Sequence, residues 1–544
     1  MAECSTAAES LIPCLPAEAA TRLLAVLSSE PAVEEVWLYG SRAMGRHRQG
    51  SDIDLALVAP ALQHSDRLRL MEALDELLLP WSIDLALHHE LPEPLRQHIA
   101  RVGRRLHAAP ALQSHQDQSR LALLGLSDAM KRITPAPTSA IPQPSTPPAA
   151  AHRLAAVLDP VIPVVGELVR RTPGTLSLAQ GMVNWGPPPA VAEAVRAALQ
   201  QPGPALDRYG PTWGDPELRA AAQHKLHTFN QLDLDGSFLL ITSGSNMAFQ
   251  AVVQAICDPG SEVIIPLPYY FNHVMAVQLA GGVAVPVEAG PIPDPEQLAA
   301  AITPRTRAIV TVSPNNPSGL VLPPERLQAI NRLCEQRGLF HISDEAYDLF
   351  VHGAVPHWSP GSLSGSAAHT ISLYSLSKGY GMAGWRIGYS AIPTALQPAL
   401  AKVIDTVQVS PPGITQKAAI AALSSDPAWL SRQLQTLEPR RQQLLAAVAA
   451  WQAEGLPLRL WAEPDGAFYG LLVIEGLGLS SDALMERLVL KHRVAAVSGR
   501  AFGFEPPGCC ALRLSYGMLS ESELAEALER LAEGVRRLRQ RSEQ

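Results

Sequence analysis

Cysteine is scarce in this chain of 544 residues, which has six cysteines and no C-x-x-C pair. The sequence therefore predicts neither a disulfide framework nor a cysteine-ligated metal, and we expect a reducing, cytoplasmic location. An excess of positive charge is also absent, because the formal net charge is −8, so broad nucleic-acid binding through a basic surface is not expected. No apolar run reaches membrane-spanning length, and no basic residue precedes Arg22. We therefore expect no membrane helix, signal peptide or arginine-rich transit peptide.

The composition is that of an ordinary globular protein, with 47% hydrophobic and 17% charged residues. The length predicts about three or four domains. Residues 133–151 are rich in Pro, Ser, Thr and Ala without apolar periodicity, which predicts an extended spacer. We expect an N-terminal domain over 1–110, a linker over 111–152, and a C-terminal domain over 153–544 whose large lobe spans about 195–430 and whose small lobe comes from the flanking segments.

Beyond residue 160, strand-like apolar runs alternate with helical segments rich in Ala and Leu. This alternation predicts an α/β fold with a mostly parallel sheet covered by helices. Near the C-terminus, a capping-box pattern begins at Ser520 and predicts the start of an amphipathic helix.

The segment SLSKGYGMAGWRIGY (Ser375–Tyr389) carries the most chemical information. It places Lys378 three residues after Ser375 and eight before Arg386, among glycines and other small residues. An amine of lowered pKa can bind an aldehyde as a Schiff base, while a hydroxyl and a guanidinium can hold a phosphate dianion. The segment therefore predicts a pyridoxal phosphate (PLP) site. For this fragment alone, a solvated Ser/Gly-rich loop is the alternative.

Four further segments each bring polar residues to the end of an apolar run. Asp344 ends a predicted buried strand, and a buried acid needs a partner such as a pyridinium N–H. Asn316 follows the apolar run RAIVTV and precedes a Pro/Gly turn. FLLITSGSNMAFQ reads as strand, Gly/Ser turn and helix, so backbone N–H groups at the helix start would face an anion. EVIIPLPYY predicts a strand that ends in two tyrosines.

The order of these segments resembles that of the class I/II aminotransferases among the fold-type I PLP enzymes, over about residues 155–538. The resemblance implies a PLP-dependent aminotransferase that moves the amino group of an L-amino acid to a 2-oxo acid. It also implies a large α/β domain with a mostly parallel sheet, a smaller α/β lobe, and a homodimer.

The resemblance gives roles to the residues around the cofactor ring. Lys378 resembles the Schiff-base lysine, and Asp344 resembles the carboxylate that keeps the pyridine nitrogen protonated. Tyr347 and Asn316 resemble the pair that hydrogen-bonds the cofactor's 3′-oxygen.

The phosphate ligands are expected from several segments. Ser375 and Arg386 resemble phosphate ligands, joined by the turn at Ser245 and Asn246. Tyr209, in RYGPTWGDPELR, resembles a tyrosine that reaches the phosphate of the neighbouring subunit, and this is why a homodimer is expected.

Tyr270 resembles the ring that stacks on the pyridine, with Tyr269 as the alternative if the register differs by one residue. Arg513 resembles the arginine that grips the substrate's α-carboxylate. Gly181, at the start of GMVNW, is expected in the substrate pocket together with Asn316.

Three features depart from the family pattern. Ser318 stands where threonine is usual, His273 stands where many relatives have an aromatic residue, and GMVNW replaces a more usual Gly-x-Pro-Asp-Phe. The last two are expected to touch the substrate pocket, so they leave the substrate open. Because Arg513 is the one arginine clearly assignable to a substrate carboxylate, a dicarboxylic preference is neither shown nor excluded. Other fold-type I enzymes such as C–S lyases share these residues and remain an alternative.

The N-terminal residues carry a second pattern, EEVWLYGSRAMGRHRQGSDIDLALVA. Asp52 and Asp54 alternate along an apolar strand, so both carboxylates face the same side, and Asp84 lies in another short apolar strand. Clustered carboxylates favour a bound cation, and hard oxygen ligands of this kind suit Mg²⁺. Gly40 and Ser41 open a predicted helix whose N-terminus could receive the phosphates of a nucleotide.

This pattern resembles the minimal nucleotidyltransferases of the DNA polymerase β superfamily, over about residues 16–108. Their signature of Gly-Ser, then Gly, then Ser-Asp-x-Asp reads here as Gly40-Ser41, Gly45 and Ser51-Asp52-Ile53-Asp54. The resemblance implies binding of a nucleoside triphosphate. Three alternatives stay open: a domain that has lost catalysis, a regulator that uses the PLP domain as a sensor, and a protein whose main activity is nucleotide transfer.

Overall fold

The computed structural model describes residues 12–108, except 14, 31, 45–52, 61, 63–69, 72, 75–76, 78–82, 89–90 and 92, and residues 151–542, except 202 and 204–205. The chain divides into two compact units, Met1–Gln143 and Pro144–Gln544, which we describe separately. The expected linker over 111–152 lies almost entirely outside the described residues. No helix in the described ranges is long and apolar enough to cross a bilayer.

The N-terminal unit is built around a sheet in the strand order β3-β2-β1-β4. Strand β1 pairs antiparallel with β2 and β4, while β2 pairs parallel with β3. Apolar residues from α1 and the strands, including Leu23, Leu38 and Leu55, form its core. The described elements are α1 (Ala17–Ser28), β1 (Glu35–Tyr39), α2 (Gly40–Ala43), β2 (Ile53–Val58), β3 (Ile83–Leu87), α4 (Glu93–Val102) and β4 (Arg104–Ala108).

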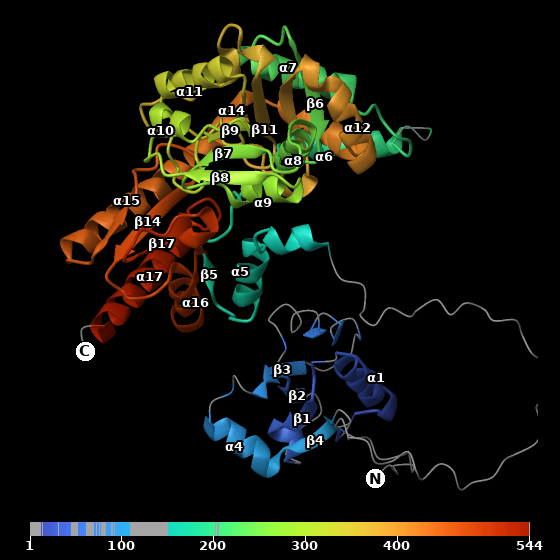
Figure 1. Ribbon diagram of the computed structural model, residues 1–544, viewed down its shortest axis with the longest axis vertical. Helices are drawn as coiled ribbons and strands as arrows, with labels where there is room; N and C mark the ends of the chain where they lie inside the picture. The colour runs from blue at the N-terminus through green and yellow to red at the C-terminus, as the bar shows by residue number, and fades with distance from the viewer. Residues whose placement is uncertain are drawn as a thin grey trace, which may run out of the picture. The chain divides into compact units, whose positions relative to one another are not determined.

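The large lobe of the C-terminal unit contains a seven-stranded sheet in the order β6-β12-β11-β10-β9-β7-β8 (Figure 1). Strand β12 runs antiparallel to both of its neighbours, and the other described pairs are parallel. The strands are β6 (Ser237–Thr242), β7 (Glu262–Pro266), β8 (Val283–Val287), β9 (Thr306–Val312), β10 (Phe340–Asp344), β11 (Thr370–Ser375) and β12 (Gly388–Pro393).

Helices cover both faces of this sheet because successive strand residues point to opposite sides. Val263 and Ile265 of β7 join one core cluster, while Ile264 joins another. The helices around the sheet are α6 (Pro189–Gln200), α7 (Pro216–Thr228), α8 (Ser245–Ile256), α9 (Phe271–Leu279), α10 (Pro295–Ala300), α11 (Pro324–Arg337), α12 (Gln397–Val407) and α13 (Gly413–Leu423). The mostly parallel α/β fold predicted from the alternating sequence is confirmed.

The small lobe holds an antiparallel sheet in the order β13-β14-β17-β16. A separate short parallel pair joins β5 to β15. The helices and strands of the small lobe are α5 (Val161–Arg170), β5 (Leu176–Ser177), α14 (Pro427–Gln435), α15 (Leu437–Ala453), β13 (Leu458–Leu460), β14 (Tyr469–Glu475), α16 (Ser481–His492), β15 (Val494–Ala495), β16 (Val497–Ser498), β17 (Cys509–Ser515) and α17 (Glu521–Ser542). The predicted capping box is present, since Glu523 N–H donates to Ser520 Oγ and Ser520 N–H donates to the Glu523 carboxylate.

A buried ion pair fixes the turn that follows β10. Lys225 of α7 donates to Asp348, and Asn230 Nδ2 donates to the same carboxylate oxygen at 3.2 Å. Lys225 Nζ also donates to Asn230 Oδ1 at 2.7 Å. Both charged side chains are almost fully buried, so each depends on the other to offset its loss of hydration.

We expect Asp348→Ala to destabilise the C-terminal unit by about 3–5 kcal/mol, because it leaves the Lys225 ammonium buried without its counter-charge. The double variant Lys225→Met/Asp348→Leu should recover most of this loss. Glu167→Ala is the control, since it removes surface ion pairs with Arg170 and Arg171 and should cost about 1 kcal/mol. Scanning calorimetry of the full chain measures each transition. An Asp348→Ala transition like that of Glu167→Ala would contradict the prediction.

Candidate functional site

Strand ends bring the predicted site residues to one edge of the large sheet. The parallel strands β10 and β11 end at Asp344 and Ser375, and Asn316 follows the end of β9. Arg386 precedes the antiparallel strand β12, so it enters at the same edge. The carboxyl edge of a parallel sheet is the usual place for a ligand site, because loops and helix N-termini gather there.

These residues line a cavity of about 290 Å³, which we call the lysine cavity. Its lining residues include most of the predicted cofactor and substrate residues: Gly181, Ser245, Asn246, Tyr270, Asn316, Asp344, Tyr347, Ser375, Lys378, Arg386 and Arg513. The remaining lining residues are Ile162, Met182, Phe271, Val312, Ala346, Ser377 and Tyr469. Segments that are distant in the sequence therefore converge on one site.

The ammonium group of Lys378 loses its proton more readily than that of an ordinary lysine. Burial lowers the pKa of Lys378 to about 8, and the positive charges of Arg513 and Arg386 contribute, while Asp344 opposes the shift. Its Nζ donates to the Gly181 carbonyl at 2.5 Å. A lysine of lowered pKa is neutral, and hence nucleophilic, in a useful fraction of molecules near neutral pH.

Asp344 is held by two hydrogen-bond donors. His273 Nε2 lies 2.9 Å from Asp344 Oδ2, and the Ala346 N–H donates to Oδ1 at 3.0 Å. The His273 ring stacks on Phe249 with a centroid distance of 4.1 Å. His273 is not among the residues that line the lysine cavity, so the sequence-based expectation that it touches the substrate pocket is not met. It lies instead against the Asp344 carboxylate.

A hydrogen-bonded group surrounds Arg513. Its Nη1 donates to Asn316 Oδ1 at 2.9 Å and its Nη2 donates to the Ala179 carbonyl at 2.5 Å. The guanidinium carbon lies 4.6 Å from the centroid of the Tyr469 ring. Its buried Nε has no hydrogen-bond partner among the described residues.

The Tyr347 and Tyr469 hydroxyls are 2.8 Å apart, and burial raises the pKa of both. Tyr469 was not predicted from the sequence as a site residue. The sequence around Tyr469 gives only a weak signal: a Pro-Asp-Gly segment, then an aromatic pair whose second member begins β14.

The other end of the lysine cavity is suited to an anion. Helix α8 begins there at Ser245, and Arg386 Nη2 donates to the Ser243 carbonyl at 3.3 Å beside it. Ser375 Oγ accepts the Ser377 N–H at 3.1 Å. Backbone N–H groups at a helix start, a hydroxyl and a guanidinium together form a phosphate-binding set.

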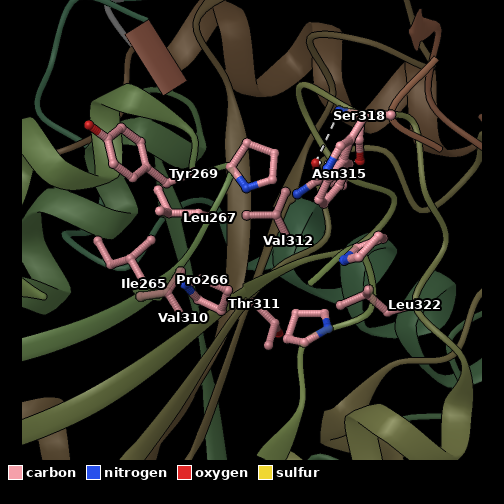
Figure 2. A pocket seen from close by; sticks show the side chains of 14 residues that line it. Ile265, Pro266, Leu267, Tyr269, Val310, Thr311, Val312, Asn315, Ser318 and Leu322 are labelled. Carbon is pink, nitrogen blue, oxygen red and sulfur yellow. Dashed lines mark hydrogen bonds between the residues drawn. The ribbon is translucent and has the colours of Figure 1, made fainter. Parts of the chain in front are cut away.

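Tyr269 lines a separate small cavity of about 30 Å³, which we call the proline cavity (Figure 2). In Figure 2, Ser318 and Asn315 lie at one end of it, where Ser318 Oγ donates to Asn315 Oδ1 at 2.8 Å. Tyr270, not Tyr269, lines the lysine cavity. Tyr209 lines neither cavity, and its side chain is 86% exposed.

The lining of the lysine cavity fits PLP. It offers an amine for the aldehyde, a buried carboxylate for the ring nitrogen, and the anion-binding set for the phosphate. The volume is close to the lower end, roughly 300 Å³, of the range for small-molecule sites.

The N-terminal unit places Tyr39, Asp54 and Asp84 in one row across three strands. Asp54 pairs with Tyr39 in the antiparallel register and with Asp84 in the parallel register. Burial raises the pKa of Tyr39 to about 12, and the negative charges of Asp84 and Asp54 add to the shift. Gly40 has φ +70°, and a Cβ there would overlap the Asp54 carboxylate. A glycine is therefore required beside this acid.

Of this second predicted site, Asp52, Gly45, Ser51 and the Ser41 side chain lie outside the described residues. Among the described residues, no group of three or more His, Cys, Asp or Glu side chains could hold a metal ion.

Comparison with known proteins agrees with this geometry. Residues 174–531 match the family model for aminotransferase class I and II, and residues 22–109 match the model for polymerase beta nucleotidyltransferases. A probable aspartate/prephenate aminotransferase of Thermus aquaticus is 36% identical over 379 residues, which cover 68% of this chain and 94% of that protein. An aromatic aminotransferase of Arabidopsis thaliana is 31% identical over 395 residues, with 70% and 94% covered.

A solved structure of Thermus thermophilus aspartate aminotransferase with maleate has a TM-score of 0.64 at 34% identity, covering 71% of this chain and 100% of that one. The family match spans well over half of the sequence, and the relatives are matched over nearly their whole length. The chain therefore belongs to the aminotransferase class I and II family and is a PLP-dependent transaminase.

Proposed function

We propose that the C-terminal unit transfers the amino group of an L-amino acid to a 2-oxo acid in the lysine cavity. The observation that carries this is the convergence of a low-pKa amine, a buried carboxylate, an anion-binding set and a buried arginine on one cavity. Bound PLP supplies the electron sink that stabilises the substrate after its Cα–H bond breaks. The names of the relatives include aspartate and aromatic substrates, so they leave the donor open.

Each protein group then has a defined task. Lys378 Nζ takes the Cα proton and later returns a proton, and a pKa near 8 suits both directions of transfer. Arg513 orients the α-carboxylate through its forked N–H groups, with Asn316 beside it. Asp344, held by His273 and the Ala346 N–H, keeps the ring nitrogen protonated.

Other lining residues hold the cofactor. Ser245, Asn246, Ser375 and Arg386 bind the phosphate, Tyr347 and Asn316 bind the 3′-oxygen, and Tyr270 stacks on the ring. The free thiols of Cys257, Cys334, Cys509 and Cys510 support a reducing, cytoplasmic location.

We expect Lys378→Ala to abolish covalent attachment of PLP and all transamination, because the described lining of the cavity contains no second lysine. Borohydride reduction followed by mass spectrometry should find the cofactor on Lys378 in the wild type and nowhere in the variant. Lys402→Ala, on an exposed side chain of α12, is the control and should label normally. A reduced adduct in the Lys378→Ala protein would overturn the assignment.

We also propose a homodimer in which Tyr209 reaches the phosphate of the neighbouring site. Its 86% exposure in one subunit supports this, because an aromatic side chain of that exposure is available to a partner.

Hybrid dimers test this arrangement. A Lys378→Ala subunit would donate an intact Tyr209 to the lysine of a Tyr209→Ala subunit. After subunit exchange at equal amounts, with enough PLP to fill intact sites but too little to activate the Tyr209→Ala parent, about one quarter of wild-type activity should appear, because half of the dimers have one intact site out of two. Activity no higher than the mean of the two parent variants would place Tyr209 in its own subunit's site or in none.

For the N-terminal unit we propose binding of a nucleoside triphosphate with Mg²⁺ through Gly40, Ser41, Asp52, Asp54 and Asp84. The adjacent placement of Asp54 and Asp84 supports this, because paired carboxylates favour a bound cation that can also hold a triphosphate.

Asp54→Asn keeps the shape of the side chain and removes its charge, so Mg²⁺-dependent nucleotide binding to the full chain should fall at least about tenfold. Calorimetry with each of the four common ribonucleoside triphosphates measures this. Asp235→Asn, on an exposed loop of the other unit, should bind as the wild type does. If the wild type binds none of the four, the domain is a scaffold without nucleotide binding.

A further inference from the structure

Large apolar side chains remain uncovered at the lysine cavity. Ile162, in the first turn of α5, is 41% exposed, and Met182 is 37% exposed, although both line the cavity. Single exposed apolar side chains are common on protein surfaces, but these two line a ligand cavity, where they are available to cover an apolar part of a ligand.

These side chains stand next to the reacting groups. Met182 follows Gly181, whose carbonyl accepts a hydrogen bond from Lys378 Nζ. A Cβ on Gly181 would lie 2.7 Å from the Tyr469 hydroxyl, so the Tyr469 ring borders the same space. Because Tyr469 also lies under the Arg513 guanidinium, a substrate whose carboxylate contacts Arg513 would extend its side chain among Ile162, Met182 and Tyr469.

Each cationic side chain in the described lining of the cavity already has a proposed partner. Its described lining contains three cations, Lys378, Arg386 and Arg513, and the proposed function gives these to the cofactor's aldehyde, its phosphate and the substrate's α-carboxylate. Two buried arginines of the small lobe are engaged elsewhere, since Arg440 donates to the Gly517 carbonyl and Arg441 to the Pro464 carbonyl. Neither lines the cavity.

We propose that the amino donor of this enzyme carries a large apolar side chain, bound in a subsite formed by Ile162, Met182 and Tyr469. The proposal rests on the proposed aminotransferase function. A second carboxylate in this subsite would lose its hydration without gaining a cationic partner from the described lining, which is strongly unfavourable. An apolar side chain would instead cover the two exposed side chains.

The first test is the half-reaction of the holoenzyme with single amino acids, without an acceptor, followed by the change in cofactor absorbance. L-Phenylalanine and L-methionine should react with a second-order rate constant at least about tenfold above that of L-aspartate and L-glutamate. A faster reaction with L-aspartate would overturn the subsite. If no amino acid changes the spectrum, the aminotransferase function itself fails, which is a different result.

A binding measurement gives a readout without turnover. By calorimetry, the unreactive 3-phenylpropionate should bind the holoenzyme at least about tenfold more tightly than succinate, since both offer a carboxylate to Arg513 and only succinate carries a second one. Tighter binding of succinate would contradict the proposal.

Substitutions test whether the subsite determines the preference for an apolar amino donor. Met182→Lys introduces a cation into the subsite and should raise the ratio of aspartate to phenylalanine kcat/KM by at least about tenfold. Leu154→Lys is the matched control, because Leu154 is also an exposed apolar side chain but does not line the cavity, and its ratio should stay at the wild-type value. An equal change in both variants would show that general surface charge, not the subsite, sets the preference.

Discussion

The lysine cavity depends on a balance of charge. Its described lining contains three cationic side chains, Lys378, Arg386 and Arg513, and one carboxylate, that of Asp344. Burial penalises the charged form of Lys378 and lowers its pKa to about 8, and the excess of cations over carboxylates adds to this shift. The same excess of positive charge favours anions, so the electrostatics that activate the amine also attract a phosphate and a carboxylate.

This balance requires that Asp344 stay where it is. His273 and the Ala346 N–H hold its two oxygens, and four residues later Asp348 forms the buried pair with Lys225. The turn after β10 is therefore fixed at both ends by polar contacts, one to α9 and one to α7. Buried polar groups of this kind are costly unless every partner is present, which is how a local turn becomes tied to the packing of the whole lobe.

Most of the expected site residues that line the lysine cavity have positions that follow from local rules. Asp344 and Ser375 end apolar strands, and Ser245 starts a helix. Arg386 follows Lys378 by eight residues, just before β12. Sequence spacing therefore predicts that these residues lie at one edge of the sheet. Tyr469 and His273 obey no such rule. Tyr469 arrives from the small lobe, and the contact between His273 and Asp344 depends on how α9 packs on the sheet. Contacts of this kind are set by tertiary packing, which a single sequence does not encode in a readable spacing.

The residues that serve the reaction also differ in their position from those proposed to select the substrate. The amine, the carboxylate and the anion-binding set sit on the ends of a rigid sheet, where a shift in one element would disturb all of them. Ile162 and Met182 come instead from the segment before the sheet begins, on α5 and the loop that follows β5. Side chains there can change without moving Lys378 or Asp344, so one reaction can serve many amino acids. The motifs therefore predict the reaction, while the choice of donor depends on a few apolar residues that carry no motif.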